Sequence, residues 1–153
     1  MTDEIIQSYN FRISRANRSE LTVIIFDIAL EYAEEALNPE GNFERSISKI
    51  AECIETLKNT LDFTYELAGT LLHLYIRMKK QLYKALFSGK KEDVEPVKYA
   101  LISLREAFDT VSREDNSAPL YSNIEDVAAG YTYGRDDINI NPSSASGNRG
   151  FFA

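Results

Sequence analysis

The apolar residues of this chain recur at the spacing of α-helices in four successive segments. The first is ambiguous at its centre, because residues 21–30 (LTVIIFDIAL) are rich in the β-branched and aromatic residues that favour strands. Its flanks favour a helix: Asn17 and Glu20 have the spacing of a capping box. Asn38 and Pro39 then stop the pattern. We therefore predict a first helix from Asn17 to Asn38.

Three further helices follow from the same pattern. The second begins near Asn42 and places Phe43, Ile47, Ile50, Ile54, Leu57 and Leu61 in one apolar stripe. The third runs from about Tyr65 to Phe87 and ends at Gly89, because glycine supplies the left-handed residue that helix C-termini favour. The fourth begins near Asp93, a candidate cap. Its apolar residues alternate in steps of four and three, typical of a bundle seam: Val97, Leu101, Leu104, Phe108 and Val111.

The third helix carries apolar residues on two sides. One stripe consists of Leu67, Leu71, Leu74, Met78 and Leu82. A second stripe, formed by Leu72, Ile76, Tyr83 and Phe87, lies around the side of the helix. A helix that is apolar on two sides has more than one neighbour.

Short connections between successive helices force antiparallel neighbours, so the expected fold class is all-α, an antiparallel up-down four-helix bundle. The bundle domain would span residues 1–112, with residues 1–15 as a short N-terminal segment lying on it. Residues 113–153 are rich in Gly, Ser, Asn and Asp and would form an extended C-terminal tail. Apolar residues recur along this tail, as anchors for docking into a groove or as parts of a disordered segment: Leu120, Tyr121, Ile124, Val127, Tyr131, Tyr133, Phe151 and Phe152.

Composition narrows the classes of partner and compartment. The net charge of −7 and the pI near 4.8 argue against binding to a nucleic acid backbone, which requires a basic patch. The chain has neither a leader pattern nor a stretch approaching the ~20 apolar residues of a membrane span, so we expect a cytoplasmic protein without membrane insertion. A single cysteine, Cys53, suits a reducing compartment and a packing role.

Asp27 is the residue that most invites a chemical interpretation, because it lies inside the apolar run. A buried carboxylate is a catalytic group, a metal ligand or a structural anchor. A di-iron site in a helical bundle needs Glu-x-x-His pairs, but the chain has one histidine, His73, preceded three residues earlier by Thr70. No nucleophile with a base and no phosphate-binding loop is recognisable. We therefore expect no enzyme, cofactor or metal, and interpret Asp27 as an anchor.

The donors expected for Asp27 are Tyr9, Tyr75 and the backbone N–H groups of the N-terminal segment. Asp27 shares a helix face with Val23, Ile24 and Leu30, so its partners must lie on a neighbouring segment.

Several stretches resemble the FliS family of flagellin-specific export chaperones, over most of residues 9–111. The family's first helix follows a Tyr and then Thr-Ala-Ser-Pro-x-x-Leu-x-x-Met-Leu-Tyr-Asp-Gly-Ala. Here Tyr9 precedes residues 15–29 (RANRSELTVIIFDIA), and Asp27 falls on the family's acid. Residues 70–78 (TLLHLYIRM) are similar to the family's third-helix pattern Asn-Leu-Tyr-x-Leu-Tyr-x-Tyr-Met. Just before them, Leu61-Asp62 is similar to the family's Ser-Leu-Asp. Asp93-Val94 and residues 104–108 (LREAF) are similar to the family's last helix. The departures are Arg18 for Pro, Ile28 for Gly and Thr70 for Asn.

The resemblance implies a cytoplasmic chaperone that binds the C-terminal segment of flagellin and prevents premature polymerisation. It also implies delivery of the subunit to the flagellar type III export apparatus, with export-gate components as further partners, and no use of nucleotide. The three departures leave a second hypothesis open: a helical-bundle adaptor or regulator that binds another protein.

A candidate flagellin-binding groove follows from the two-sided third helix, because flagellin's terminal segment is amphipathic and such a helix can receive it. The predicted groove residues are Leu72, Ile76 and Tyr83 of the third helix and Ile50, Ile54 and Leu57 of the second. The alternative is that all six are ordinary core residues. The N-terminal segment with Ile5, Ile6 and Tyr9, or the aromatic tail, would cover the groove when no client is bound and so shield an apolar patch.

Overall fold

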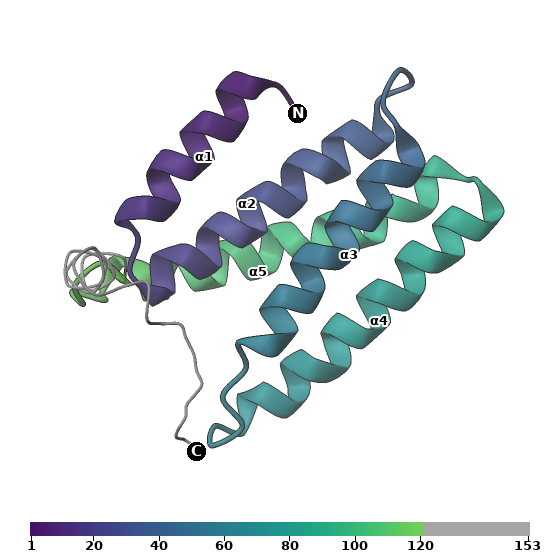
Figure 1. Cartoon of the computed structure of the whole chain (residues 1–153). Helices are drawn as coiled ribbons and strands as arrows, with labels where there is room; N and C mark the ends of the chain where they lie inside the picture. The colour runs from purple at the N-terminus through teal and green to yellow at the C-terminus, as the bar shows by residue number, and fades with distance from the viewer. Residues whose placement is uncertain (121–153) are drawn as a thin grey trace, which may run out of the picture.

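The structure, a computed structural model, describes residues 1–120, and this part of the chain contains α-helices but no strand (Figure 1). The expected all-α class is therefore confirmed. The elements are α1 (Asp3–Arg15), α2 (Arg18–Leu37), α3 (Phe43–Asn59), α4 (Leu67–Ser88), a short 3-10 helix (Lys91–Val94) and α5 (Glu95–Arg113). Most of the predicted C-terminal tail, residues 121–153, lies outside the described residues.

The helix ends follow local side-chain chemistry at three of the predicted positions. Asn17 caps α2 by accepting a hydrogen bond from the Glu20 backbone N–H at 2.8 Å, and Asn42 caps α3 in the same way. Gly89 ends α4 in the left-handed conformation, with φ 71°. The roles of these three residues depend on their immediate neighbours in the sequence, so they can be predicted without knowledge of the rest of the fold.

The predicted cap at Asp93 is wrong. The 3-10 helix runs directly into α5, so the residue before α5, Val94, is already helical and leaves no extended residue to act as a side-chain cap. The Asp93 carboxylate instead accepts a hydrogen bond from Ser88 Oγ at 3.1 Å, and its carbonyl oxygen accepts one from Gln81 Nε2 at 2.9 Å. Asp93 therefore closes the turn between α4 and α5 rather than starting a helix.

The helix α2 is the centre of the packing. It lies against α3 on one side and α5 on the other, while α4 packs mainly on α3 and makes little contact with α5. Consecutive helices from α2 to α5 run in alternating directions, and α1 folds back along α2 (Figure 1). Fully buried alanines of α2, Ala29, Ala33 and Ala36, allow its neighbours to approach closely. The largest buried side chains of the core are Phe26, Ile47, Ile50, Ile54, Leu57, Tyr75, Leu82 and Leu101.

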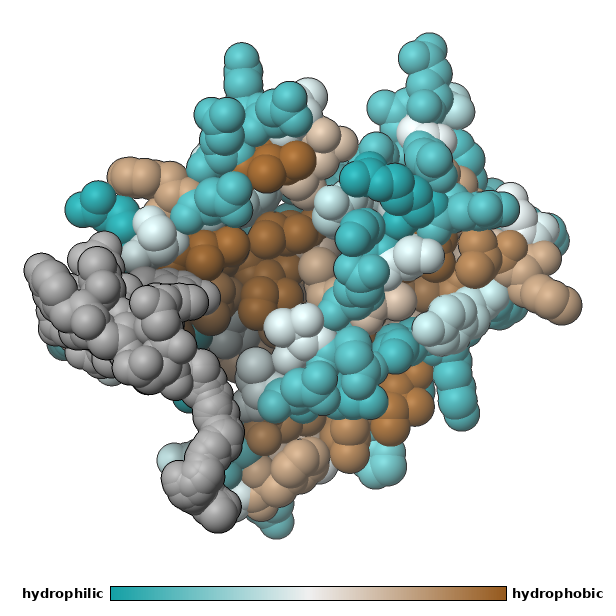
Figure 2. All heavy atoms as spheres, viewed as in Figure 1, coloured by the Kyte–Doolittle hydropathy of each residue, from teal (hydrophilic) through white to brown (hydrophobic). Residues whose placement is uncertain are grey.

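The helix α4 buries only part of its apolar surface. Its core side consists of Ala68, Tyr75, Met78, Leu82 and Ala85. Several other large apolar side chains remain exposed: Leu67, Ile76, Tyr83, Leu86 and Phe87. Figure 2 shows apolar side chains gathered in a hollow over α2, below α1 in this view, and again along the outer edge of α4. Of the first predicted stripe, Met78 and Leu82 are buried, whereas Leu67 lies at the surface.

Among residues 1–120, no helix has both the length and the apolar content needed to cross a membrane.

Candidate functional site

Asp27 is held by two arginines that come from different helices. Arg12 of α1 places Nη2 2.8 Å from Asp27 Oδ2, and Arg105 of α5 donates from Nε to Oδ1 at 2.7 Å. The carboxylate side chain is only 15% exposed, so two cations compensate a charge that would otherwise be costly to enclose. The hydrogen bond to Asp27 also raises the pKa of Arg105. The acid in the apolar run thus connects α1, α2 and α5.

The donors predicted for Asp27 need correction. They are arginine side chains rather than Tyr9, Tyr75 or backbone N–H groups, although one of them does come from the N-terminal segment. Tyr9 lies nearby: burial, followed by the carboxylates Glu31 and Asp27, raises its pKa to about 12. Tyr75 lies in the core on α4. Arginine side chains bind a carboxylate more strongly than tyrosine hydroxyls or backbone N–H groups, because a guanidinium group supplies both hydrogen bonds and the opposite charge.

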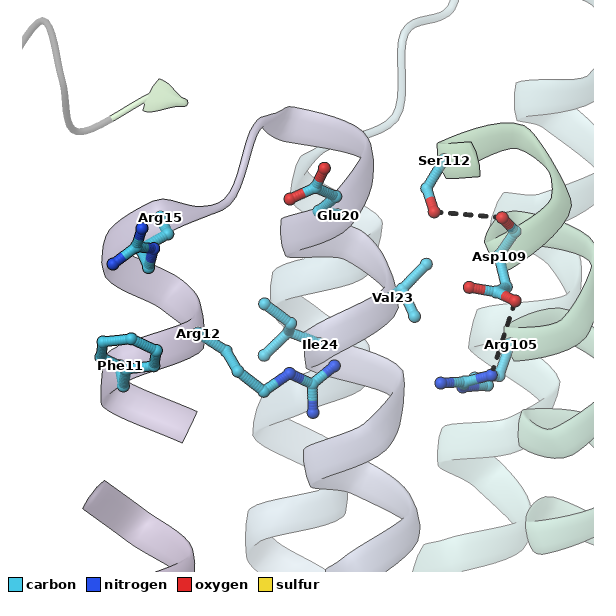
Figure 3. Close-up of a pocket in the computed structure, with 9 residues that line it drawn as sticks. All are labelled: Phe11, Arg12, Arg15, Glu20, Val23, Ile24, Arg105, Asp109 and Ser112. Atoms are coloured by element: carbon cyan, nitrogen blue, oxygen red, sulfur yellow. Dashed lines mark hydrogen bonds and ion pairs between the residues drawn. The ribbon is translucent and has the colours of Figure 1, made fainter. Parts of the chain in front are cut away.

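A cleft of about 310 Å³ opens between α1, α2 and α5 beside this cluster (Figure 3). Val23 and Ile24 of α2 give it an apolar wall, and Arg12 and Arg105 reach into it from opposite sides (Figure 3). Because both arginines bind Asp27, their charges are already engaged within the protein. The cleft is therefore part of the attachment of α1 rather than a free anion site.

The predicted cap residues lie on α1, over α2. Ile5 and Tyr9 are half-buried and Ile6 is exposed. Besides the pair between Arg12 and Asp27, the Met1 amino group lies 3.5 Å from Glu35 Oε1, so both ends of α1 are fixed to α2. The structure does not bring these residues to the predicted groove residues of α3 and α4, because the ion pairs direct α1 to α2.

The six predicted groove residues divide into two sets. Ile50, Ile54 and Leu57 of α3 are at most 1% exposed and belong to the core. For these three the alternative of ordinary core residues describes the structure, because α3 packs against both α2 and α4 and its single stripe is covered. On α4, Leu72 is half-buried, Ile76 is 39% exposed and Tyr83 is 52% exposed. Of the six, Ile76 and Tyr83 are exposed and Leu72 is only partly accessible.

Two shallow grooves run along α4. The first, of about 290 Å³, lies between α3 and α4, where Ala51 and Leu86 accompany Tyr83. Lys79 Nζ crosses it to Glu55 Oε1 at 2.7 Å, and Lys58 also binds Glu55. The second groove, of about 190 Å³, lies between α4 and α5. It is lined by Leu74, Arg77, Met78, Gln81, Pro96, Val97 and Ala100.

Leu86 is the surface residue that the sequence reasoning missed. It lies three positions after Tyr83, and residues three apart share a helix face, so this spacing was the available signal. Together with Ile76, Tyr83 and Phe87 it forms the exposed apolar side of α4, which we call the α4 outer face.

Cys53 and His73 do not form a catalytic or metal-binding site in the described part of the chain. Burial raises the pKa of the Cys53 thiol to about 11, so the reactive thiolate is scarce at neutral pH. His73 is exposed on α4. Within residues 1–120, no group of three or more His, Cys, Asp or Glu side chains is arranged to hold a metal ion.

Comparison with models of protein families gives a match over the described helices. The family model described as "Flagellar protein FliS" matches residues 1–115, whereas no curated protein sequence matches the chain. The matched range contains all five α-helices of the described residues, the Asp27 cluster and the α4 outer face. Because the match covers most of the chain, this protein belongs to the FliS family of flagellar proteins.

Proposed function

We propose that this protein is a cytoplasmic export chaperone that binds the C-terminal segment of flagellin. In this role it prevents premature polymerisation and delivers the subunit to the flagellar type III export apparatus, where export-gate components are further partners. Membership of the FliS family implies a flagellar chaperone role rather than an enzymatic one. The binding unit would be residues 1–112, acting as an antiparallel four-helix bundle.

The exposed apolar side of α4 is the observation that carries this proposal. Large contiguous patches of exposed apolar surface are rare on monomeric proteins and usually mark an interaction site, whereas single exposed apolar residues are common. Phe87 is 99% exposed, and Ile76, Tyr83 and Leu86 recur along the same helix. An amphipathic client helix places its own apolar residues at steps of three and four, which suits the grooves on either side of α4. Full burial of an exposed side chain such as Phe87 stabilises a complex by about 1.5–3 kcal/mol before ordering costs, and the partly covered Ile76 and Tyr83 contribute less.

Our proposed contact set is therefore narrower than the six residues expected from the sequence. Leu72, Ile76 and Tyr83 contact the client directly, while Ile50, Ile54 and Leu57 support α4 from below. Packed core residues of this kind keep a binding surface rigid, and a rigid surface loses less entropy on association.

The N-terminal helix α1 has a covering role in the same proposal. With Ile5 and Tyr9 half-buried, α1 covers apolar surface of α2 when no client is present. Its attachment is polar and partly exposed, through Arg12 and the Met1 amino group, so it can be exchanged at modest cost. The α2 surface that α1 covers is separate from the α4 outer face, so release of α1 would expose a second apolar surface rather than open the client surface on α4.

Calorimetric titration of the whole protein with a peptide of the flagellin C-terminal segment tests the proposal. We expect micromolar or tighter binding to the natural sequence and loss of binding on Ile76→Asp, with unchanged helicity by circular dichroism. Ser103→Asp, which adds the same charge at an exposed position of α5, is the matched control. Absence of binding to the natural sequence would favour the adaptor hypothesis, and unfolding of Ile76→Asp would assign Ile76 to the core.

A further inference from the structure

Residues 114–120 leave α5 and return to the junction between α1 and α2. The Asn17 side-chain amide donates to the carbonyl oxygens of Asp115 and Ser117, each at 3.3 Å. At the same time its oxygen caps α2, so both ends of an amide that is only 2% exposed are satisfied. Ser19 Oγ donates to the Asp115 carboxylate at 2.5 Å. Hydrogen bonds from Ser117 and then Ser19 lower the pKa of Asp115, so this contact holds at neutral pH.

The last described residue is fixed at the same place. The Leu120 backbone N–H donates to the Ala16 carbonyl oxygen at 3.0 Å. Whatever follows in the chain therefore starts beside the first turn of α2. Arg18, two residues after Ala16, is one of the residues that line an apolar cavity.

This cavity, which we call the end cavity, lies between α2, the connection from α3 to α4, α4 and α5. Its volume is about 230 Å³. The residues that line it are Arg18, Thr22, Thr60, Leu61, Asp62, Tyr65, Leu67, Ala68, Leu71, Tyr75 and Phe108. Tyr65 and Leu67 are 69% and 63% exposed. Arg18 is the one cation among these lining residues and Asp62 is the one acid. Hydrogen bonds from Thr64 lower the pKa of Asp62 most, and the charge of Arg18 lowers it further.

The sequence that follows Leu120 has the pattern and charge that such a cavity would accept. Ile124, Val127 and Tyr131 follow Leu120 at steps of four, three and four, which places them on one side of a helical segment. Glu125 and Asp126 carry the charge opposite to that of Arg18. A stretch of ten residues covers ~15 Å as a helix or ~33 Å extended, enough to cross the end of a helical bundle whose axes lie ~10 Å apart.

We propose that the end cavity is a docking site for residues 120–131 of the same chain. The apolar side of the segment covers Leu67 and Leu71, and its acidic residues pair with Arg18. This site is separate from the α4 outer face and requires no client. The docked segment also connects the α1–α2 junction to the first turns of α4, so it stabilises the end of the bundle where α3 and α4 are joined.

A single tryptophan at the rim tests the proposal in the full chain. The chain contains no tryptophan, so Leu67→Trp gives one emitter at an exposed rim position. We expect emission at the shorter wavelengths of a covered indole. Adding Ile124→Asp and Val127→Asp shifts it to the wavelength of an exposed indole. Ile138→Asp with Ile140→Asp, the same change further along the tail, leaves the emission as it was. Identical emission from all three proteins overturns the proposal.

Two further measurements test whether a second copy of the chain fills the cavity and whether the proposed charge pairing is correct. Docking within one chain is independent of concentration, so a wavelength that moves to the exposed value on ~100-fold dilution would assign the cavity to a second copy and overturn the proposal. In the Leu67→Trp background, Arg18→Glu weakens docking, and Glu125→Lys with Asp126→Lys restores it. A charge exchange that fails to restore the emission contradicts the assigned pairing.

Discussion

The helices α3 and α4 are both built around apolar stripes, but α4 is the more apolar of the two and its neighbours cover less of it. The single stripe of α3 is covered on both sides, because α3 lies between α2 and α4. The helix α4 has α3 on one side and little contact with α5 on the other, so Ile76, Tyr83 and Phe87 remain at the surface. The presence of an apolar stripe therefore does not by itself identify a binding surface. The number of neighbouring elements decides which apolar residues remain available to a partner.

The largest expected difference is in folding stability. Ile54→Ala should lower the free energy of unfolding by about 2–5 kcal/mol, because it empties space in a fully buried part of α3. Ile76→Ala, a matched change on α4, should lower it by less than about 1 kcal/mol, since the side chain is partly in water. Urea unfolding followed by circular dichroism measures both. Equal losses would mean that α3 and α4 do not differ in the way described.

The attachment of α1 should be the next most sensitive feature. Asp27→Asn removes a charge that pairs with Arg12 and Arg105, and we expect a loss of about 1–2 kcal/mol, since both arginines are partly exposed. Amide exchange should accelerate in α1 more than in α4. Glu34→Gln, which removes the exposed partner of Lys98, is the control that should change neither quantity. Unchanged exchange in α1 would show that Asp27 does not hold it.

A smaller effect is expected when only one side chain of the α4 outer face is shortened. Tyr83→Ala should weaken binding of the flagellin C-terminal peptide about tenfold, because the ring borders the groove between α3 and α4. Tyr99→Ala removes a ring from α5 that is more exposed than Tyr83 and lies outside the lining of both grooves, so it should leave affinity unchanged. Titration calorimetry compares the two. A greater loss for Tyr99→Ala would move the binding surface to α5.

The smallest expected effect is the pH dependence contributed by the ion pair across the α3–α4 groove. Hydrogen bonds from Lys79 and then Lys58 lower the pKa of Glu55. Its stabilising contribution is therefore complete above the pKa of the unfolded chain and is lost as pH falls through the lower folded value. Urea midpoints should decline between about pH 5 and pH 3, and less steeply in Glu55→Gln. An identical slope in the variant would exclude a contribution from this pair.

The sequence revealed features that depend on neighbouring residues and missed those that depend on distant ones. Asn17 and Asn42 cap the starts of helices and Gly89 ends one, each through local chemistry, and all three helix boundaries were predicted. Arg12 and Arg105 meet Asp27 from 15 and 78 positions away, a pairing that no local pattern encodes. Asp93 failed as a cap because the 3-10 helix continues into α5.

The sequence predicted which residues of the candidate site share a helix side, but not which of those sides a neighbouring helix covers. The sequence assigned Ile76 and Tyr83 of α4 to a stripe of their own and left core and groove open for them, and both are exposed in the structure. The stripe of α3 could not be assigned to core or groove, because a helix that faces the interior and one that faces a client have the same apolar period. Only the positions of α2 and α4 decide that Ile54 is enclosed.

Chemical-shift mapping of the isotope-labelled protein with the flagellin C-terminal peptide is the most direct test of the α4 outer face as the client surface. The account predicts that the largest changes fall on Ile76, Tyr83 and Phe87, with Tyr99 on α5 unaffected. Saturable binding whose largest changes lie elsewhere, with these three α4 residues unchanged, would contradict it.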